Sequence, residues 1–277
     1  MKKGVVVSDI HAGSIYGLLP PGFITFEGVE KKLNVGQQYL WECWQDFCER
    51  VKEFKPDFVI ANGDLIDGPQ KKNHGSELSL ITPGDQSKAA TQTLQYLRKA
   101  TGSACKWYFT QGTPYHTGAY GDAEEDIAHK CSAEKYPSVG TGKYCREVLT
   151  LEVDGGLMVE AAHHISTASV YKTTPLEKES QATWMANVTH ETPRIDLAIR
   201  SHVHHYRNVE HGTGKILTTP CWQLQTRYAR KNSVSRLLPD IGGVFFVLDY
   251  QAKKAGGEWC RLWPEKYILP PVQVAKL

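Results

Sequence analysis

Near its start the chain contains the stretch Gly4-Val-Val-Val-Ser-Asp-Ile-His11. Its run of β-branched residues is typical of a buried strand. The run ends directly in an acid and an imidazole, Asp9 and His11. A short apolar run that stops at such side chains predicts a strand followed by a functional loop. The same arrangement recurs further along the chain.

Two more buried strands follow, and a helix precedes each of them. The apolar residues of 37–54 recur at helical spacing, which predicts an amphipathic helix that Pro56 ends, and 57–61 is the second strand. A second helix is predicted over 87–100 and a third strand over 106–110. This order predicts a parallel sheet with right-handed crossovers, in which ligands bind beyond the carboxyl ends of the strands.

The rest of the chain is predicted to add a second sheet. The turn Asp154-Gly155-Gly156 predicts a hairpin between its flanking strands. Long loops are expected at 18–33 and 69–84. The further elements that we expect are short helices over 122–133 and 176–188, and strands over 144–153, 157–162, 195–199, 215–219 and 243–250, the last two antiparallel. Because no repeat or linker interrupts the pattern, we expect one α/β domain over 1–277, with two packed sheets and outer helices.

Composition excludes several classes of protein. The formal net charge is +2, so no strong overall attraction to nucleic acid or to anionic membranes is expected. The seven cysteines are odd in number and contain no C-x-x-C pair, which argues against a disulfide framework and against cysteine-ligated zinc. No signal-peptide core or membrane-spanning apolar run occurs. We expect a cytoplasmic protein, and no oligomeric state is predicted.

Five short polar clusters each follow a predicted strand. They are Asp9-x-His11, Gly63-Asp64, 112–116, His163-His164 and His202-x-His204. Alternation along a strand or its continuation is expected to place both side chains of an x-separated pair on one face. Each cluster alone has a simpler interpretation, such as a capping Asp or an Asn-Gly turn. Their joint occurrence at strand ends predicts a metal site, and their N/O ligands suit Mn, Fe, Zn, Ni or Co.

The order D-x-H, G-D, a G-N-H-like element, H and H-x-H resembles the calcineurin-like metallophosphoesterases over residues 9–204. Asp9-Ile-His11 and Asn62-Gly63-Asp64 match the family pattern. His202-Val-His204 also matches, with Ser201 where the family usually has Gly. The resemblance implies a four-layer α/β/β/α metallophosphatase sandwich and a site for two divalent metal ions, with Mn²⁺ favoured.

The resemblance also implies a role for each residue. The implied ligands are Asp9, His11 and His204 for the first metal, Asp64 as the bridge, and His163 and His202 for the second. His164 is an alternative to His163, because the sequence cannot choose between neighbouring histidines. Asp67 is expected either behind the ligands or in a turn.

One cluster departs from the family pattern. The family has Gly-Asn-His, in which Asn is a metal ligand and His assists catalysis, whereas this chain has Gly112-Thr113-Pro114-Tyr115-His116. Thr113 is expected to offer a weaker oxygen ligand, or water to take its place. This departure puts the affinity for the second metal in doubt. His116 is the best candidate for the catalytic histidine. Asp64 is the other candidate catalytic residue.

The implied chemistry is hydrolysis of a phosphate ester. Two metals roughly 3.5–4 Å apart would clamp the attacking and leaving oxygens, and a bound water would fall from a pKa of about 15.7 towards about 7. The metal-bound hydroxide would attack phosphorus in line. His116 would stabilise the transition state or protonate the leaving oxygen, an effect of about 10²–10⁴-fold.

Candidates for substrate binding are weaker. Arg227 and Arg230 belong to a small basic cluster that a solvated face explains more simply, although a groove for a phosphate backbone is the functional alternative. His74 follows Asp64 in a polar loop and is a further candidate for substrate contact.

Three functions compete. A phosphodiesterase acting on a nucleotide or nucleic acid is favoured over a phosphomonoesterase with the same site. The third is a non-catalytic metal-binding or scaffolding protein that retains the fold, and the missing Asn motivates it.

Overall fold

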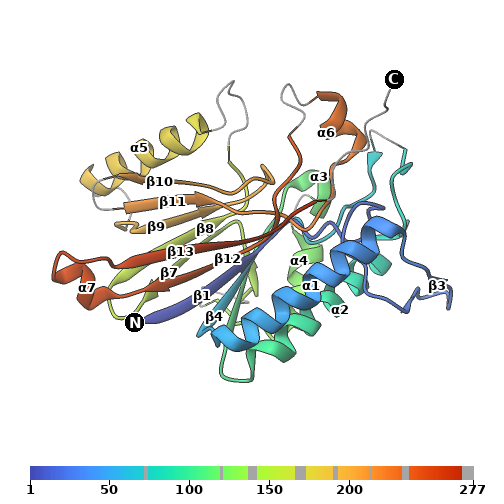
Figure 1. The fold of residues 1–277 in the computed structure, drawn as a ribbon, viewed down its shortest axis with the longest axis horizontal. Coiled ribbons are helices and arrows are strands. Elements are labelled where there is room, and N and C mark those ends of the chain that lie inside the picture. The colour runs from blue at the N-terminus through green and yellow to red at the C-terminus, as the bar shows by residue number, and fades with distance from the viewer. Residues whose placement is uncertain are drawn as a thin grey trace.

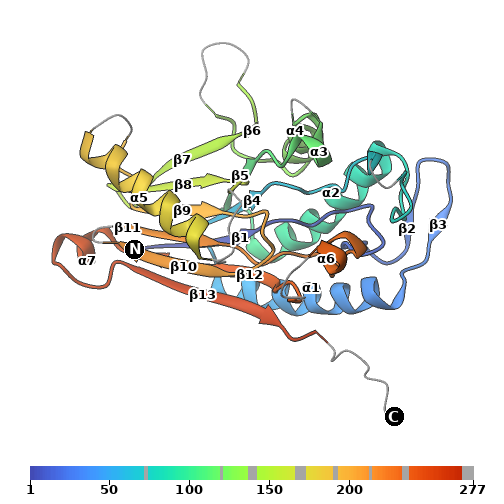
Figure 2. The ribbon, with the colours of Figure 1, turned by 90° about the horizontal axis from the view of Figure 1, so that it is seen from above.

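The structure of the chain, a computed structural model, describes residues 1–71, 74–118, 121–136, 142–165, 173–189, 193–211, 214–232 and 237–269. Two mixed β-sheets pack against each other, and helices cover the outer face of each sheet (Figures 1 and 2). This confirms the predicted α/β fold of two packed sheets with outer helices. No helix in the described ranges has both the length and the apolar character needed to cross a bilayer.

The first sheet has the strand order β13-β12-β1-β4-β5-β6. Its four parallel strands are β1 (Lys2–Val7), β4 (Phe58–Asn62), β5 (Lys106–Thr110) and β6 (Cys145–Arg146). Two antiparallel strands complete one side, β12 (Ile241–Leu248) and β13 (Cys260–Tyr267). The parallel strands place their carboxyl ends at one edge of the sheet, as the sequence predicted.

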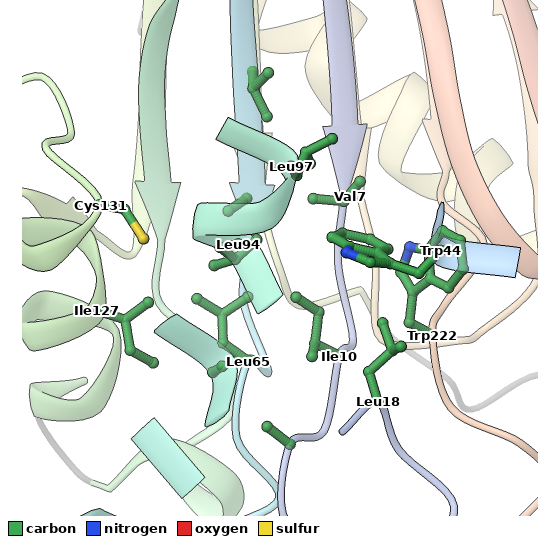
Figure 3. Packing of buried hydrophobic residues seen from close by; sticks show 14 of the residues in the cluster. Val7, Ile10, Leu18, Trp44, Leu65, Leu94, Leu97, Ile127, Cys131 and Trp222 are labelled. Carbon is green, nitrogen blue, oxygen red and sulfur yellow. The ribbon is translucent and has the colours of Figure 1, made fainter. Parts of the chain in front are cut away.

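Three helices cover the outer face of this sheet: α1 (Val35–Phe54), α2 (Pro83–Thr101) and α4 (Asp122–Lys130). Asn34 and Gln37 form a capping box at the start of α1. Thr82 caps α2 by accepting a hydrogen bond from the backbone of Asp85, and the helix begins at Pro83, four residues before the predicted start. Trp44, Leu94 and Ile127 bring the three helices into one apolar core (Figure 3).

The second sheet has the order β10-β11-β9-β8-β7. Its strands are β7 (Val148–Val153), β8 (Leu157–Ala162), β9 (Leu197–Arg200), β10 (Arg207–His211) and β11 (Gly214–Thr218). The predicted Asp154-Gly155 turn joins β7 to β8, and both of its residues have the positive φ that such a turn requires. Helix α5 (Thr174–Thr189) covers the outer face. Side chains of both sheets, among them Ile60 and Val159, form the core between them.

Some predicted elements were wrong in detail. The segment 144–153 is not one strand: β6 pairs with β5 in the first sheet, whereas β7 pairs with β8 in the second. The chain crosses between the sheets here, which a pattern of local apolar residues cannot reveal. The predicted strand 215–219 runs antiparallel to β10 but parallel to β9.

The remaining elements are short or lay outside the prediction. The expected loop at 18–33 contains a small hairpin of β2 (Phe23–Ile24) and β3 (Glu30–Lys31). The short helices α3 (Pro114–Thr117), α6 (Arg227–Asn232) and α7 (Tyr250–Lys254) were not predicted, nor were β10 and β13. All seven cysteines are buried, and none of them forms a disulfide in the structure.

Candidate metal centre

Loops that follow strands of both sheets meet at one place. The side chains that they bring together are Asp9 and His11 after β1, Asp64 after β4, His116 in α3 after β5, His163 after β8, and His202 and His204 after β9. These residues form three overlapping groups, and within each group the potential ligand atoms lie within 4.8 Å of one another. Residues up to 195 positions apart in the chain, from Asp9 to His204, therefore share one site.

The backbone of these loops is unusual. Asp9, His11, Asp64, His202 and His204 all have positive φ, between 47° and 72°. The left-handed region is unfavourable for residues other than glycine, and such positions cluster at functional sites. Asp9 and His11 do lie in one ligand group, as expected, but the left-handed backbone brings them together and strand alternation does not. Backbone hydrogen bonds from Asp9 to Gly63 and from His11 to Asp64 hold two of the loops together.

The first group contains Asp9, His11 and His204. Asp9 Oδ1 lies 3.1 Å from His204 Nε2 and 3.8 Å from His11 Nε2. On its other side, the His11 ring donates from Nδ1 to Asp67 Oδ1 over 3.0 Å. Asp67 therefore lies behind a candidate ligand and fixes the orientation of its ring.

The second group contains Asp64, His163 and His202. Asp64 Oδ2 lies 2.9 Å from His163 Nε2 and 4.0 Å from His202 Nδ1. The His163 ring donates from Nδ1 to the Asn62 carbonyl over 2.7 Å. His164 is exposed and stacks on His202 with ring centroids 5.3 Å apart. Of the two neighbouring histidines, the structure places His163 inside the cluster.

The third group contains His11, Asp64 and His116. His116 donates from Nδ1 to the Asp67 carbonyl over 2.7 Å, and its ring centroid lies 4.6 Å from that of His11. Thr113 contacts Asp64 instead of extending the ligand set. Its backbone N–H donates to Asp64 Oδ1 over 2.7 Å, and its hydroxyl donates to the same oxygen over 3.1 Å.

The buried carboxylates and imidazole rings of the site shift each other's pKa values. Burial alone would raise the pKa of Asp9 and of Asp64, but His163 and other nearby histidines hold the pKa of both well below the usual range. Burial alone would lower the pKa of His11 and of His163, yet the neighbouring carboxylates raise these values to about 10 and about 9. The pKa of His116 is lowered, first by burial and then by the nearby charge of His11.

The donor set fits divalent cations. Ten buried side-chain atoms make no hydrogen bond within the described part of the chain, and three of them are atoms of candidate ligands: Asp9 Oδ1, His11 Nε2 and His163 Nε2. They belong to the same cluster, since Asp9 Oδ1 lies 3.7 Å from His163 Nε2. Buried polar atoms normally have partners, so unpaired atoms that converge suggest a missing ligand. Carboxylate and imidazole atoms are suitable ligands for the first-row metals expected from the sequence.

Several residues of the site had no clear signal in the sequence. Gln223 donates to Asp67 Oδ1 over 3.1 Å. Glu124 is fully buried behind the site, and burial followed by the charge of Asp64 raises its pKa to about 8. Asn62, predicted only to lie in a turn that matches the family pattern, donates to Ser201 Oγ over 2.6 Å. An alternation of polar and apolar residues identifies neither an isolated Gln in a loop nor a carboxyl that is buried on a helix.

Below the cluster, a network of buried side chains links the two sheets. Ser201 Oγ accepts hydrogen bonds from Asn62 and from Thr219, over 2.6 Å and 2.8 Å. The Thr219 hydroxyl also lies 2.6 Å from that of Ser8. Ser201, where the resemblance implies Gly, therefore has a structural use in this chain.

The weaker candidates for substrate binding are exposed side chains. His74 and Arg230 are exposed. Arg227 is also exposed and lies 3.7 Å from Glu77, which belongs to the loop expected at 69–84.

Comparisons with known proteins gave only distant similarities. No protein-family model matches the sequence, and no curated protein matches it. Among solved structures, the chain is similar to vacuolar protein sorting 29 of Cryptosporidium parvum, at 11% identity over 88% of this chain and 84% of that chain, with a TM-score of 0.41. It is also similar to a predicted phosphoesterase of Streptococcus pneumoniae TIGR4, at 12% identity over 88% of this chain and 82% of that one, with a TM-score of 0.35.

A third similar structure is a novel archaeal phosphodiesterase, at 11% identity over 94% of this chain and 98% of that chain, with a TM-score of 0.43. At this level of identity and with these TM-scores, the similarities assign no activity to the chain, and the geometry of the site has to carry the functional conclusion.

Proposed function

We propose that residues 1–277 form one metal-dependent phosphoesterase domain, with phosphodiesters favoured as substrates. The observation that carries this proposal is the convergence of two ligand groups, Asp9–His11–His204 and Asp64–His163–His202, with unpaired buried atoms between them. The first group would hold one cation and the second group the other. Asp64 would bridge them, since a carboxylate has two oxygens.

The cations, when bound, would supply Lewis acidity toward the phosphoryl group and activate water at neutral pH. The residues of the chain would position them. Asp67 and the Asn62 carbonyl orient His11 and His163 through their Nδ1 atoms. Thr113 holds the Asp64 carboxylate in place with two hydrogen bonds. Mn²⁺ is the favoured cation, and Fe, Zn, Ni or Co would suit the same ligands.

The open side of the cluster would receive the substrate. His202, His204 and His116 are the partly exposed members of the ligand groups, whereas the others are buried. A phosphate ester would therefore approach past these three rings. Nucleotides and nucleic acids are the candidate substrates, and Arg227 and Arg230 on α6 would meet a longer phosphate backbone.

Two substitutions test the proposal. Asp64→Asn and His204→Ala should each reduce metal-dependent hydrolysis of a nitrophenyl phosphodiester by about 10³-fold or more, because losing several kcal/mol of charge stabilisation costs tenfold per about 1.4 kcal/mol. His129→Ala, which removes an exposed histidine of α4, is the matched control. Full activity in either site variant would refute the proposal. A panel of single-stranded DNA, cyclic nucleotides and phosphomonoesters separates a diesterase from a monoesterase.

One observation favours a second candidate function. Thr113 donates to Asp64 rather than presenting a free ligand, so the second group lacks the oxygen that the resemblance implies. A non-catalytic protein that binds a single cation is the alternative. It predicts one metal per chain and no turnover with any divalent ion.

A further inference from the structure

We propose that His116 is a ligand of the cation shared by His11 and Asp64, rather than a proton donor to the leaving group. This inference rests on the proposed function, since it assigns a residue to the same metal centre. It goes beyond that function because the resemblance gives the histidine of this segment a role in proton transfer. Two extra residues, Pro114 and Tyr115, separate Thr113 from His116 and place this histidine on the helical turn α3.

The local fold places His116 above His11. Pro114 begins the single turn of α3, whose backbone bonds run from His116 and Thr117 back to the carbonyl of Thr113. Gly68 fixes this turn from the other side: a Cβ atom at Gly68 would lie 2.4 Å from the carbonyl oxygen of His116. The ring therefore has a defined position instead of the freedom of a side chain on an open loop.

The hydrogen bond of the ring determines which nitrogen is free. The partner of His116 Nδ1 is a backbone carbonyl, which can only accept, so Nδ1 must carry the proton. In a neutral imidazole, Nε2 then has the lone pair. His163 has the same arrangement, with Nδ1 on the carbonyl of Asn62. His11 has its Nδ1 on the carboxylate of Asp67.

This pattern is characteristic of metal-ligating histidines, which donate the second ring nitrogen to a carbonyl or carboxylate. Because His116 shares its ligand group with His11 and Asp64 and not with His163 or His202, it would complete the first cation's shell and leave the second with fewer protein ligands.

Equilibrium dialysis of metal-free protein against Mn²⁺, followed by elemental analysis, tests this assignment. We expect His116→Ala and the conservative His116→Gln to reduce the binding affinity for one of the two cations by at least about 10–100-fold. This is the range seen when even an outer partner of a ligand is lost. Free imidazole should restore the affinity of His116→Ala. The absorption spectrum of bound Co²⁺ should change in both variants, whereas His129→Ala should match the wild type.

The outcomes separate this inference from the proposed function. If the wild type binds two cations and hydrolyses phosphodiesters, but both His116 variants keep wild-type affinity and Co²⁺ spectrum, His116 is not a ligand and the function stands. If the wild type itself binds no cations, the proposed function fails, and this inference fails with it.

Discussion

The candidate centre has two halves, the ligand groups Asp9–His11–His204 and Asp64–His163–His202, and different residues orient the histidines of each half. Behind His11 lies a carboxylate, Asp67, which is itself held by side-chain hydrogen bonds from Gln223 and Gln70. Behind His163, among the residues that the structure describes, lies the neutral carbonyl of Asn62. The first half therefore concentrates more negative charge, and a charged outer partner raises the basicity of the ligand in front of it. We expect the first cation to bind more tightly and the second to exchange more readily.

Solvent exposure of the ligands does not distinguish the two halves. The side chains of His204 and His202 are 23% and 30% exposed, so each half has one histidine at the open side. Each half also has buried ligands that solvent does not reach. The difference in expected affinity therefore comes from charge behind the rings and not from access to water.

The largest effect on metal binding is expected at Asp64, the residue proposed to bridge the two halves. A Cβ atom at Gly112 would lie 2.2 Å from Asp64 Oδ1 and 2.3 Å from the Asp64 backbone nitrogen. Gly112→Ala should therefore displace the bridging carboxylate and abolish binding of both cations, with a loss of stability of about 1–3 kcal/mol from overpacking. Metal content and thermal denaturation measure the two consequences. Wild-type metal content in this variant would show that Asp64 does not bridge.

The next effect separates the two halves. Asp67→Asn keeps the size of the side chain but removes its charge. It should therefore reduce the affinity for the first cation by about 10–100-fold and leave the affinity for the second nearly unchanged. Two-step Mn²⁺ titration calorimetry measures both affinities. Equal weakening of both cations would refute the division into a charged half and a neutral half.

A smaller effect is expected from pH on the metal-free protein. His11 and His163 have pKa values raised from 6.5 to about 10 and about 9, so the stability that they contribute is complete below pH 6.5 and is lost as pH rises through these values. Asp9 and Asp64 have lowered pKa values, so their contribution is present above pH 3.8 and is lost in acid.

The melting temperature without metal should thus be highest between pH 3.8 and pH 6.5, and it should fall as pH rises from 6.5 to about 9 and about 10. Bound cations replace the imidazolium protons, so the loaded protein should lose less stability in alkali and should release protons when it takes up metal. Identical alkaline profiles with and without Mn²⁺ would contradict this coupling.

The smallest effect is expected at the network beneath the site. Ser201→Ala removes the acceptor of Asn62 and Thr219, which should destabilise the protein by about 1–3 kcal/mol while both cations still bind. Chemical denaturation combined with metal analysis checks this. A large loss of metal would mean that the network positions the ligands as well as joining the sheets.

Much of the framework could be predicted from local patterns. The run Gly4–Val7 and the strand 106–110 have strong β propensity, and their polar ends indicated the edge where the site forms. The same patterns could not show that 144–153 crosses between the sheets, because pairing partners are set by tertiary packing. Nor could they show the left-handed backbone at Asp9 and His204, which depends on contacts between distant loops.

The candidate ligands were predictable for a different reason. Asp, His and Asp-Gly motifs are visible in the sequence, and the structure brings every one of the six implied ligands into the ligand groups. Their supporting partners were less visible. Gln223 and the Asn62 carbonyl act through geometry that no spacing rule encodes, and His116 lies on a helical turn that the departure from the expected motif concealed.

The most direct test of a dinuclear centre is a count of Mn²⁺ bound to chelator-treated protein as the ion is titrated, with phosphodiester hydrolysis followed in the same samples. We predict two cations per chain, the first bound more tightly, with hydrolysis rising only as the second is taken up. Saturation at one cation or none, without hydrolysis, would contradict the account.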